Sequence, residues 1–252
     1  MDGLQHQRGF TVIEVTLFLG ITALLFVIAV LGTGNTIRSI RFSDSGRSLA
    51  AFVQRQYDDI INGLNTRLGN ESCTAGVVNT GANQTPGTSN CLLMGRLLVF
   101  RVNNPTVLQY NVVGTAPASV NYSQTDTQLI SAFNPQAITN SGVVTYDIPW
   151  QAFLSGSKRL NDNQAVTALL LIRSPKSSRV VSYTYKAASP VVSDLSSVVN
   201  SAANVGKTTN FCLKNADNFG LPAKLVVTDA PSQQAVQIDF DADSGGNECN
   251  GV

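Results

Sequence analysis

The sequence has almost no histidine: its 252 residues include one, His6, close to the N-terminus. Histidine is the most frequent general base of enzymes and a frequent zinc ligand. Beyond residue 9, a Ser-His-Asp triad, a Cys-His pair and a histidine metal site are therefore excluded. No glycine-rich phosphate loop follows a predicted strand. We therefore expect neither an enzyme nor a cofactor.

Charge is also scarce. Lys, Arg, Asp and Glu together make up 13% of the chain, and the net charge is +1. This share is low for a soluble cytosolic domain, and the near-neutral total gives no general attraction to nucleic acid or to an acidic partner. Asn, Ser, Thr and Gln are plentiful after residue 60, together with Val and Gly. Such a composition is typical of a secreted, β-rich surface.

Cysteine is sparse and forms no CxxC pair. The four cysteines are Cys73, Cys91, Cys212 and Cys249. An even number outside the cytoplasm indicates disulfides, and four cysteines allow three connectivities. The simplest is local, Cys73–Cys91 with Cys212–Cys249. Each bridge would stabilise the fold by about 3 kcal/mol on the chain-entropy estimate.

One long apolar run extends over residues 10–32, FTVIEVTLFLGITALLFVIAVLG. It reaches the roughly 20 residues that a membrane-spanning helix needs. A cleaved secretory signal would have an apolar core of about 7–15 residues followed by a small-x-small site, and no such site ends this run. The run therefore predicts a membrane span.

The flanks of the run predict its orientation. The leader MDGLQHQRG is polar and places Arg8 next to the apolar residues, whereas the next basic residues are Arg38 and Arg41. A short N-terminal end stays in the cytoplasm more easily than a large domain does. We therefore expect a single-pass protein of the cell membrane, with a cytoplasmic N-terminus and most of the chain outside.

The motif at the start of this run is Gly9-Phe10-Thr11-Val12-Ile13-Glu14. It resembles the class III signal of type IV pilins and of the pseudopilins of type II secretion. The resemblance covers the leader, the apolar helix and the helical stem. It implies cleavage by a prepilin peptidase between Gly9 and Phe10, followed by N-methylation of Phe10. Many members of the family have proline late in the run, where this chain has Leu31.

The resemblance also gives Glu14 a role. In a filament of packed apolar helices, an unpaired carboxylate costs several kcal/mol. A neighbouring subunit's terminal amine at Phe10 would remove that cost, so Glu14 would set the register of assembly. Two alternatives stay open: Glu14 pairs with the amine of its own chain, or it is a polar residue tolerated at the end of an ordinary anchor.

Beyond Gly34 an amphipathic stem is predicted. Its apolar stripe, spaced by three and four residues, consists of Leu49, Val53, Tyr57, Ile60, Ile61, Leu64 and Leu68. This stripe predicts packing onto a sheet. Residues 43–46, Ser-Asp-Ser-Gly, interrupt the pattern, so a bend or a division of the helix is expected there. The basic residues Arg38, Arg41, Arg47 and Arg55 indicate a solvated face, or contacts with neighbouring subunits or lipid headgroups, with DNA as the weaker alternative.

The rest of the chain alternates short apolar segments with turn residues. A turn-rich loop is expected at 69–91, and residues 187–208 are predicted as a loop or a short helix. Segments rich in β-branched and aromatic residues predict strands at 96–102, 107–113, 143–149, 165–173, 179–186, 210–214, 223–229 and 235–241. No regular helix alternates with these strands. The fold class is therefore α+β: a long N-terminal helix packed on a C-terminal antiparallel sheet or small sandwich.

The acidic tail is the one further chemical feature. Asp239, Asp241 and Asp243 alternate before two glycines, a spacing of oxygen ligands that can hold Ca²⁺. The match is partial, because Ser244 stands at the usual glycine position. The simpler interpretation is a last strand with Val236, Ile238 and Phe240 inward and the aspartates in solvent. No metal is assigned.

These observations predict a leader at 1–9, an assembly helix at 10–32, a stem at 33–68 and a globular domain at 69–252. Leu92–Val102 and Thr209–Leu213 resemble the minor pseudopilin group called H, or FimT. The predicted function is a structural subunit, minor in abundance, of a pilus or a secretion pseudopilus. Its partners would be other pilin or pseudopilin subunits, the prepilin peptidase, the inner-membrane assembly platform and membrane lipid. The rival is a stand-alone membrane-anchored adhesin or ligand-binding domain.

Overall fold

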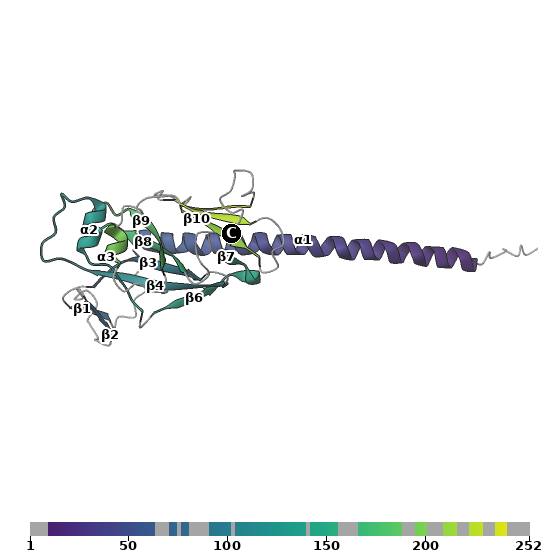
Figure 1. Ribbon diagram of the computed structural model, residues 1–252, viewed down its shortest axis with the longest axis horizontal. Helices are drawn as coiled ribbons and strands as arrows, with labels where there is room; N and C mark the ends of the chain where they lie inside the picture. The colour runs from purple at the N-terminus through teal and green to yellow at the C-terminus, as the bar shows by residue number, and fades with distance from the viewer. Residues whose placement is uncertain are drawn as a thin grey trace, which may run out of the picture. The chain divides into compact units, whose positions relative to one another are not determined.

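The computed structural model describes residues 10–63, 71–74, 77–80, 91–101, 104–139, 142–155, 166–187, 195–200, 209–215, 222–228 and 235–240. The chain divides into two compact units, residues 1–41 and residues 42–252. Helix α1 (Val12–Ile61) belongs to both units: residues 12–41 lie in the first unit and residues 42–61 in the second. The strands of the second unit pair in antiparallel sheets, so the α+β class is confirmed (Figure 1).

The described strands of the second unit form three sheets. A two-stranded sheet pairs β1 (Glu71–Thr74) with β2 (Val77–Thr80). The six-stranded sheet has the order β5-β4-β3-β8-β9, with β6 also paired to β4, and consists of β3 (Cys91–Arg101), β4 (Thr106–Thr115), β5 (Gln136–Ala137), β6 (Val144–Asp147), β8 (Val166–Arg173) and β9 (Val180–Ala187). The four-stranded sheet has the order β12-β11-β10-β7 and consists of β7 (Phe153–Ser155), β10 (Thr209–Lys214), β11 (Ala223–Val227) and β12 (Val236–Asp239). The further helical elements are α2 (Asp126–Ala132), the short 3₁₀ helix η1 (Pro149–Gln151) and α3 (Ser196–Asn200).

One face of the six-stranded sheet packs against α1 and the four-stranded sheet. The side chains that α1 buries in this core are Phe42, Leu49, Val53, Tyr57 and Ile60. From the two sheets, Phe100 of β3 meets Phe211 of β10 with ring centroids 5.2 Å apart. The predicted stripe is thus confirmed for Leu49, Val53, Tyr57 and Ile60. It is wrong for Ile61, which is 38% exposed, while Leu64 and Leu68 lie outside the described residues.

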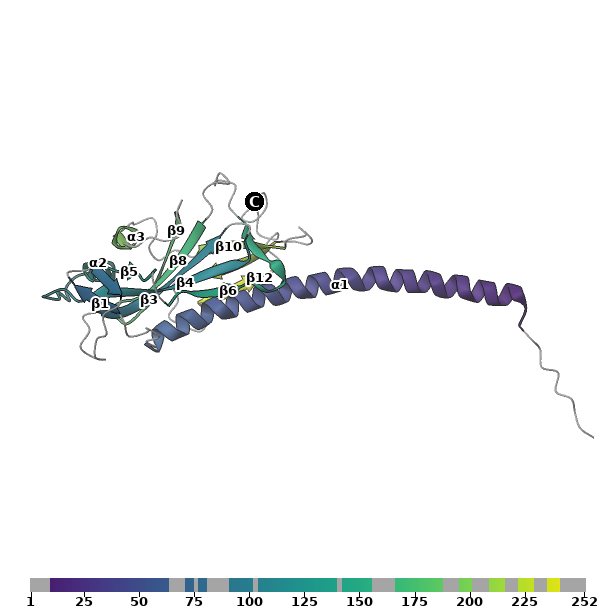
Figure 2. The ribbon, with the colours of Figure 1, turned by 90° about the horizontal axis from the view of Figure 1, so that it is seen from below.

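The opposite face of the same sheet is covered by α2 and α3. Leu129 and Ile130 of α2 and Val199 of α3 are fully buried against Leu97 and Leu170 of the sheet. Figure 2 shows residues 42–61 of α1 on one side of the sheet and these two short helices on the other. The strands between them are therefore buried on both faces. This explains why residues 168–172 of β8 form a continuous apolar run.

Helix α2 was not predicted, although its start has a recognisable sequence signal. The hydroxyl of Thr125 accepts a hydrogen bond from the backbone N–H of Gln128, and the Gln128 side chain accepts one from the backbone N–H of Thr125, which completes a capping box. Asp126, in the first turn, accepts hydrogen bonds from Ser174 and Ser177. These hydrogen bonds, the one from Ser174 most of all, lower the pKa of Asp126 and fix α2 to the turn between β8 and β9.

The predicted division of the helix at residues 43–46 is wrong, since α1 is one helix through these positions. Ser45 is buried, and its hydroxyl donates to the carbonyl of Phe42 at 2.7 Å, so the polar group is satisfied inside the helix. Gly46 lies at a close packing contact rather than at a break. An added Cβ there would lie 2.5 Å from Cδ1 of Ile238 and 3.0 Å from the ring of Phe240.

All eight predicted strands have counterparts in β3, β4, β6 and β8–β12. The structure adds β1 and β2 inside the segment expected to be a turn-rich loop, and the short strands β5 and β7. In the segment 187–208, the structure places the short helix α3 at Ser196–Asn200. The last strand also follows the expected alternation: Val236, Ile238 and Phe240 pack against the core, whereas Asp239 is exposed.

Candidate functional site

The first unit exposes a long, mainly apolar helix surface. Every large apolar side chain from Phe10 to Val30 is 45–80% exposed, on all sides of α1. Helix α1 is long and apolar enough to cross a membrane, with a mean hydropathy of 2.6 over its most apolar window, none of which is buried. Exposed apolar surfaces of this size mark sites of membrane or protein–protein interaction, and the helix could be a membrane span.

Glu14 is the acidic residue in the first turn of this helix. It is exposed, and its carboxylate has no hydrogen bond or ion pair within the described residues. Phe10 lies just before the helix and is 80% exposed, while Gly9 lies outside the described residues. Phe10 therefore directly precedes the start of α1, and Glu14 lies in its first turn, both at the same end of the apolar surface.

Thr11, a residue that was not predicted to contribute, caps this helix. Its Oγ1 accepts a hydrogen bond of 3.3 Å from the backbone N–H of Glu14, so Thr11 caps the start of α1. Thr11-x-x-Glu14 has the spacing of a capping box, a signal that was available in the sequence. The cap fixes where the helix begins, two residues after the predicted cleavage point. A carboxylate in this first turn is also favoured by the positive end of the helix dipole.

The basic residues of the stem lie in both units. Arg38 and Arg41 belong to the first unit, and Arg47 and Arg55 are exposed on the part of α1 that belongs to the second. No aromatic or glycine-rich motif accompanies them in the sequence, so nothing strengthens the DNA-binding alternative. The solvated or subunit-contacting face remains the prediction for these arginines.

Two of the four cysteines have described side chains. Cys91, at the start of β3, is 2% exposed, Cys212, in β10, is 9% exposed, and each takes part in a disulfide. Cys73 lies in β1, which contacts β3, and Cys249 lies outside the described residues. The contact between β1 and β3 favours the local pairing of Cys73 with Cys91.

We expect peptide mapping under non-reducing conditions to link Cys73 to Cys91 and Cys212 to Cys249. Each of these disulfides closes a short loop and stabilises the fold by about 3 kcal/mol on the chain-entropy estimate. The measurement is mass spectrometry of the proteolysed, exported protein with its thiols blocked before lysis. The fully reduced sample serves as the control. Linkage of Cys91 to Cys212 would contradict this connectivity.

The acidic tail gives no metal site in the described part of the chain. Asp239 is exposed on β12, and Asp241 and Asp243 lie outside the described residues. Among the described residues, no group of three or more His, Cys, Asp or Glu side chains is placed to hold a metal ion.

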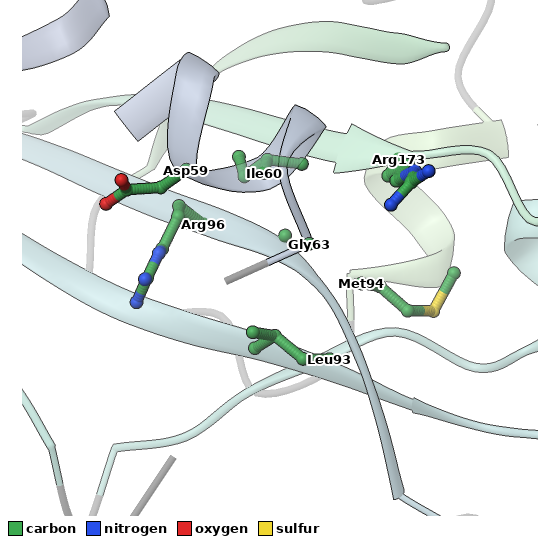
Figure 3. A pocket seen from close by; sticks show the side chains of 8 residues that line it. Asp59, Ile60, Gly63, Leu93, Met94, Arg96 and Arg173 are labelled. Atoms are coloured by element: carbon green, nitrogen blue, oxygen red, sulfur yellow. The ribbon is translucent and has the colours of Figure 1, made fainter. Parts of the chain in front are cut away.

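A polar region that was not predicted lies at the C-terminal end of α1. Asp59 of α1 and Arg96 of β3 line a small hollow of about 40 Å³ next to Gly63 (Figure 3). Figure 3 shows Arg173, from the end of β8, on the opposite side of this hollow. Arg173 lies close to Gly63, whose φ of +65° ends the helix. A cation there complements the negative end of the helix dipole.

Asp59 and Arg96 also line a larger groove of about 610 Å³, formed by α1, β3, β4 and β6 within the second unit. Arg96 is 3% exposed and contacts the amide oxygen of Asn111 on β4. Burial lowers the pKa of Arg96, and the charge of Asp59 opposes that shift. The groove therefore contains a buried guanidinium and a carboxylate close together.

Comparison with known proteins gives this chain no relative: no family model, no curated protein and no solved structure matches it.

Proposed function

We propose that this chain is a type IV pilin-like structural subunit, of a pilus or a secretion pseudopilus. The observation that carries the proposal is the first unit: an apolar helix exposed on all sides, with one carboxylate in its first turn. Lipid can cover such a helix before assembly, and the equivalent helices of other subunits can cover it afterwards. The carboxylate is costly in either apolar setting unless a cation pairs with it.

The proposed sequence of events follows from this chemistry. The leader stays in the cytoplasm, α1 crosses the membrane and the second unit lies outside. Cleavage after Gly9 frees the amine of Phe10, which N-methylation leaves cationic. Glu14 of one subunit then pairs with that amine on the next as the helices pack. In this proposal the assembly platform provides the energy for assembly, and the chain acts as a structural subunit rather than as an enzyme.

The rival function is a stand-alone membrane-anchored adhesin, for which α1 would be only an anchor. The two functions differ at the N-terminus of the protein isolated from the cell envelope. A pilin-like subunit begins at a methylated Phe10, whereas a plain anchor keeps Met1 or loses it to ordinary processing. N-terminal peptide mass spectrometry of the isolated protein separates them.

Gly9→Val is expected to block processing, because a branched side chain before the scissile bond would crowd the peptidase. The full-length protein should accumulate in the membrane with its leader attached. The measurement is the mass of the intact protein, compared with a Gly3→Val control that makes the same change elsewhere in the leader. Normal mature protein from Gly9→Val would contradict the class III assignment.

A further inference from the structure

The groove between α1 and the sheet has an unusual floor. Its base consists of three nearly buried polar side chains, Gln56 of α1, Arg96 of β3 and Gln109 of β4, with exposed fractions of 3–6%. Next to them on the same sheet face, Leu98 and Val107 are apolar and belong to the core. The three polar side chains therefore lie beside the apolar core and are not part of it.

One of these groups lacks a partner. The side-chain oxygen Oε1 of Gln56 is buried and has no hydrogen-bond partner within the described part of the chain. Native structures satisfy the large majority of buried polar atoms, so an exception at the edge of a groove points to a missing donor. The terminal amide torsion of glutamine is broad, so this oxygen can turn towards a molecule in the groove.

The polar side chains of the groove include both hydrogen-bond donors and hydrogen-bond acceptors. Arg55 and Arg96 only donate hydrogen bonds, Asp59 only accepts them, and the amides of Gln56 and Gln109 do both. A carboxylate or phosphate ligand would meet Asp59 and could not supply the donor that Gln56 lacks. A hydroxyl group is a donor and an acceptor at once, so a molecule with several hydroxyls fits this set.

An aromatic pair forms one wall of the groove. Phe52 of α1 and Tyr146 of β6 stack with centroids 4.0 Å apart and an interplanar angle of 7°. Both rings are partly buried against the core and also line the groove, so the pair gives the groove an aromatic surface that suits another flat, apolar surface. The C–H face of a pyranose ring is such a surface, and its hydroxyl edge would meet the polar floor.

We propose that this groove binds a neutral oligosaccharide. Its volume of about 610 Å³ lies within the range of about 300–1,000 Å³ for small-ligand sites. In this arrangement the aromatic wall receives sugar rings, Arg55 and Arg96 donate to sugar oxygens, and Gln56 and Asp59 accept from hydroxyls. The site lies entirely within residues 42–252, so it does not depend on how the first unit is anchored.

The test uses the full chain, purified in a polyoxyethylene detergent because a sugar-headed detergent would compete. Isothermal titration calorimetry measures binding of neutral trisaccharides of glucose, galactose, mannose and N-acetylglucosamine, with a uronic-acid trisaccharide as the charged comparison. At least one neutral trisaccharide is expected to bind at millimolar concentration or below, and more tightly than the acidic one. Binding of no neutral trisaccharide, or of the acidic one alone, would overturn the proposal.

Two variants locate the binding. Arg55→Ala removes an exposed donor of the groove, and Gln56→Met keeps the side-chain shape but removes the amide. Each is expected to weaken binding roughly tenfold, the loss expected for one well-formed hydrogen bond to a ligand. Arg47→Ala is the matched control, since it removes an exposed arginine of α1 that does not line the groove.

The control must bind like the unchanged protein, and thermal unfolding of Arg55→Ala must match that of Arg47→Ala. Equal weakening by Arg47→Ala and Arg55→Ala would show general charge attraction and overturn the site. Sugar binding that neither Arg55→Ala nor Gln56→Met weakens would also overturn it. A short peptide that displaces the sugar and loses affinity in both groove variants, while binding more tightly than any sugar, would assign the groove to a protein partner instead.

Discussion

Replacing Gly95 with alanine is expected to destabilise the second unit by about 3 kcal/mol or more. Gly95 lies at the irregularity where β3 changes register against β4, and it pairs with Ile172 of β8. A Cβ at this position would lie 1.9 Å from the carbonyl oxygen of Leu171 and 3.0 Å from Cα of Ile172. Both contacts are to backbone, so no side-chain rotation relieves them.

Relief requires the backbones of β3 and β8 to move apart. That movement would break the ladder between the two central strands and open both cores, because Leu169 and Leu171 pack on one face of β8 and Leu170 and Ile172 on the other. Few single substitutions combine overpacking with loss of sheet pairing in this way.

The measurement is urea unfolding of the full chain in detergent, followed by near-ultraviolet circular dichroism. Gly34→Ala is the control, because nothing lies within 4 Å of a Cβ built there and alanine favours a helix. The Gly95→Ala midpoint should fall sharply and the Gly34→Ala midpoint should not. A Gly95→Ala protein as stable as the control would mean that β3 and β8 do not pair in this register.

The strands could be predicted because their apolar residues alternate or form short runs between turn residues. The apolar stripe of α1 was equally readable, since positions 49, 53, 57 and 60 repeat at the helical spacing and all four side chains are buried. Ile61 is the last residue of α1, and at 3.6 residues per turn its side chain lies about 120° around the helix axis from Leu49, at the edge of the buried stripe. Short elements such as β5 and β7 carry too few residues to show any period.

The groove could not be predicted, because Gln56, Arg96 and Gln109 come from three elements that only the tertiary fold brings together. One signal was nevertheless present. Arg96, Leu98 and Phe100 alternate along β3 and share the face towards α1, so the strand pattern already places an arginine inward. A charged residue in an inward position of an apolar strand is a reason to look for a polar site there.

The Glu14→Gln substitution is expected to leave processing, membrane insertion and folding intact, and to prevent incorporation into filaments. Glu14 belongs to the first unit, so the cores of the second unit do not depend on it. Glutamine is easier to place in hydrocarbon than an ionised glutamate. It also occupies the same position of a capping box, so the start of α1 is preserved. What is lost is the negative charge that would pair with the amine of Phe10 on a neighbour.

That pairing matters most in the assembled state, where the apolar surface of residues 10–30 excludes water around both groups. An unpaired amine buried there costs several kcal/mol, and a penalty of only about 3 kcal/mol would lower incorporation roughly a hundredfold.

The test expresses Glu14→Gln together with the wild-type assembly machinery and measures its share of sheared surface filaments, after confirming cleavage and membrane localisation. Thr11→Ala is the matched control, because it removes the side-chain cap of α1 and keeps the carboxylate, at a cost of about 1 kcal/mol to the helix start. If the charge of Glu14 guides assembly, Thr11→Ala enters filaments and Glu14→Gln does not. Equal, wild-type incorporation of both variants would mean that Glu14 is only a tolerated polar residue. Failure of Thr11→Ala alone would mean that the start of the helix, rather than the charge, decides assembly.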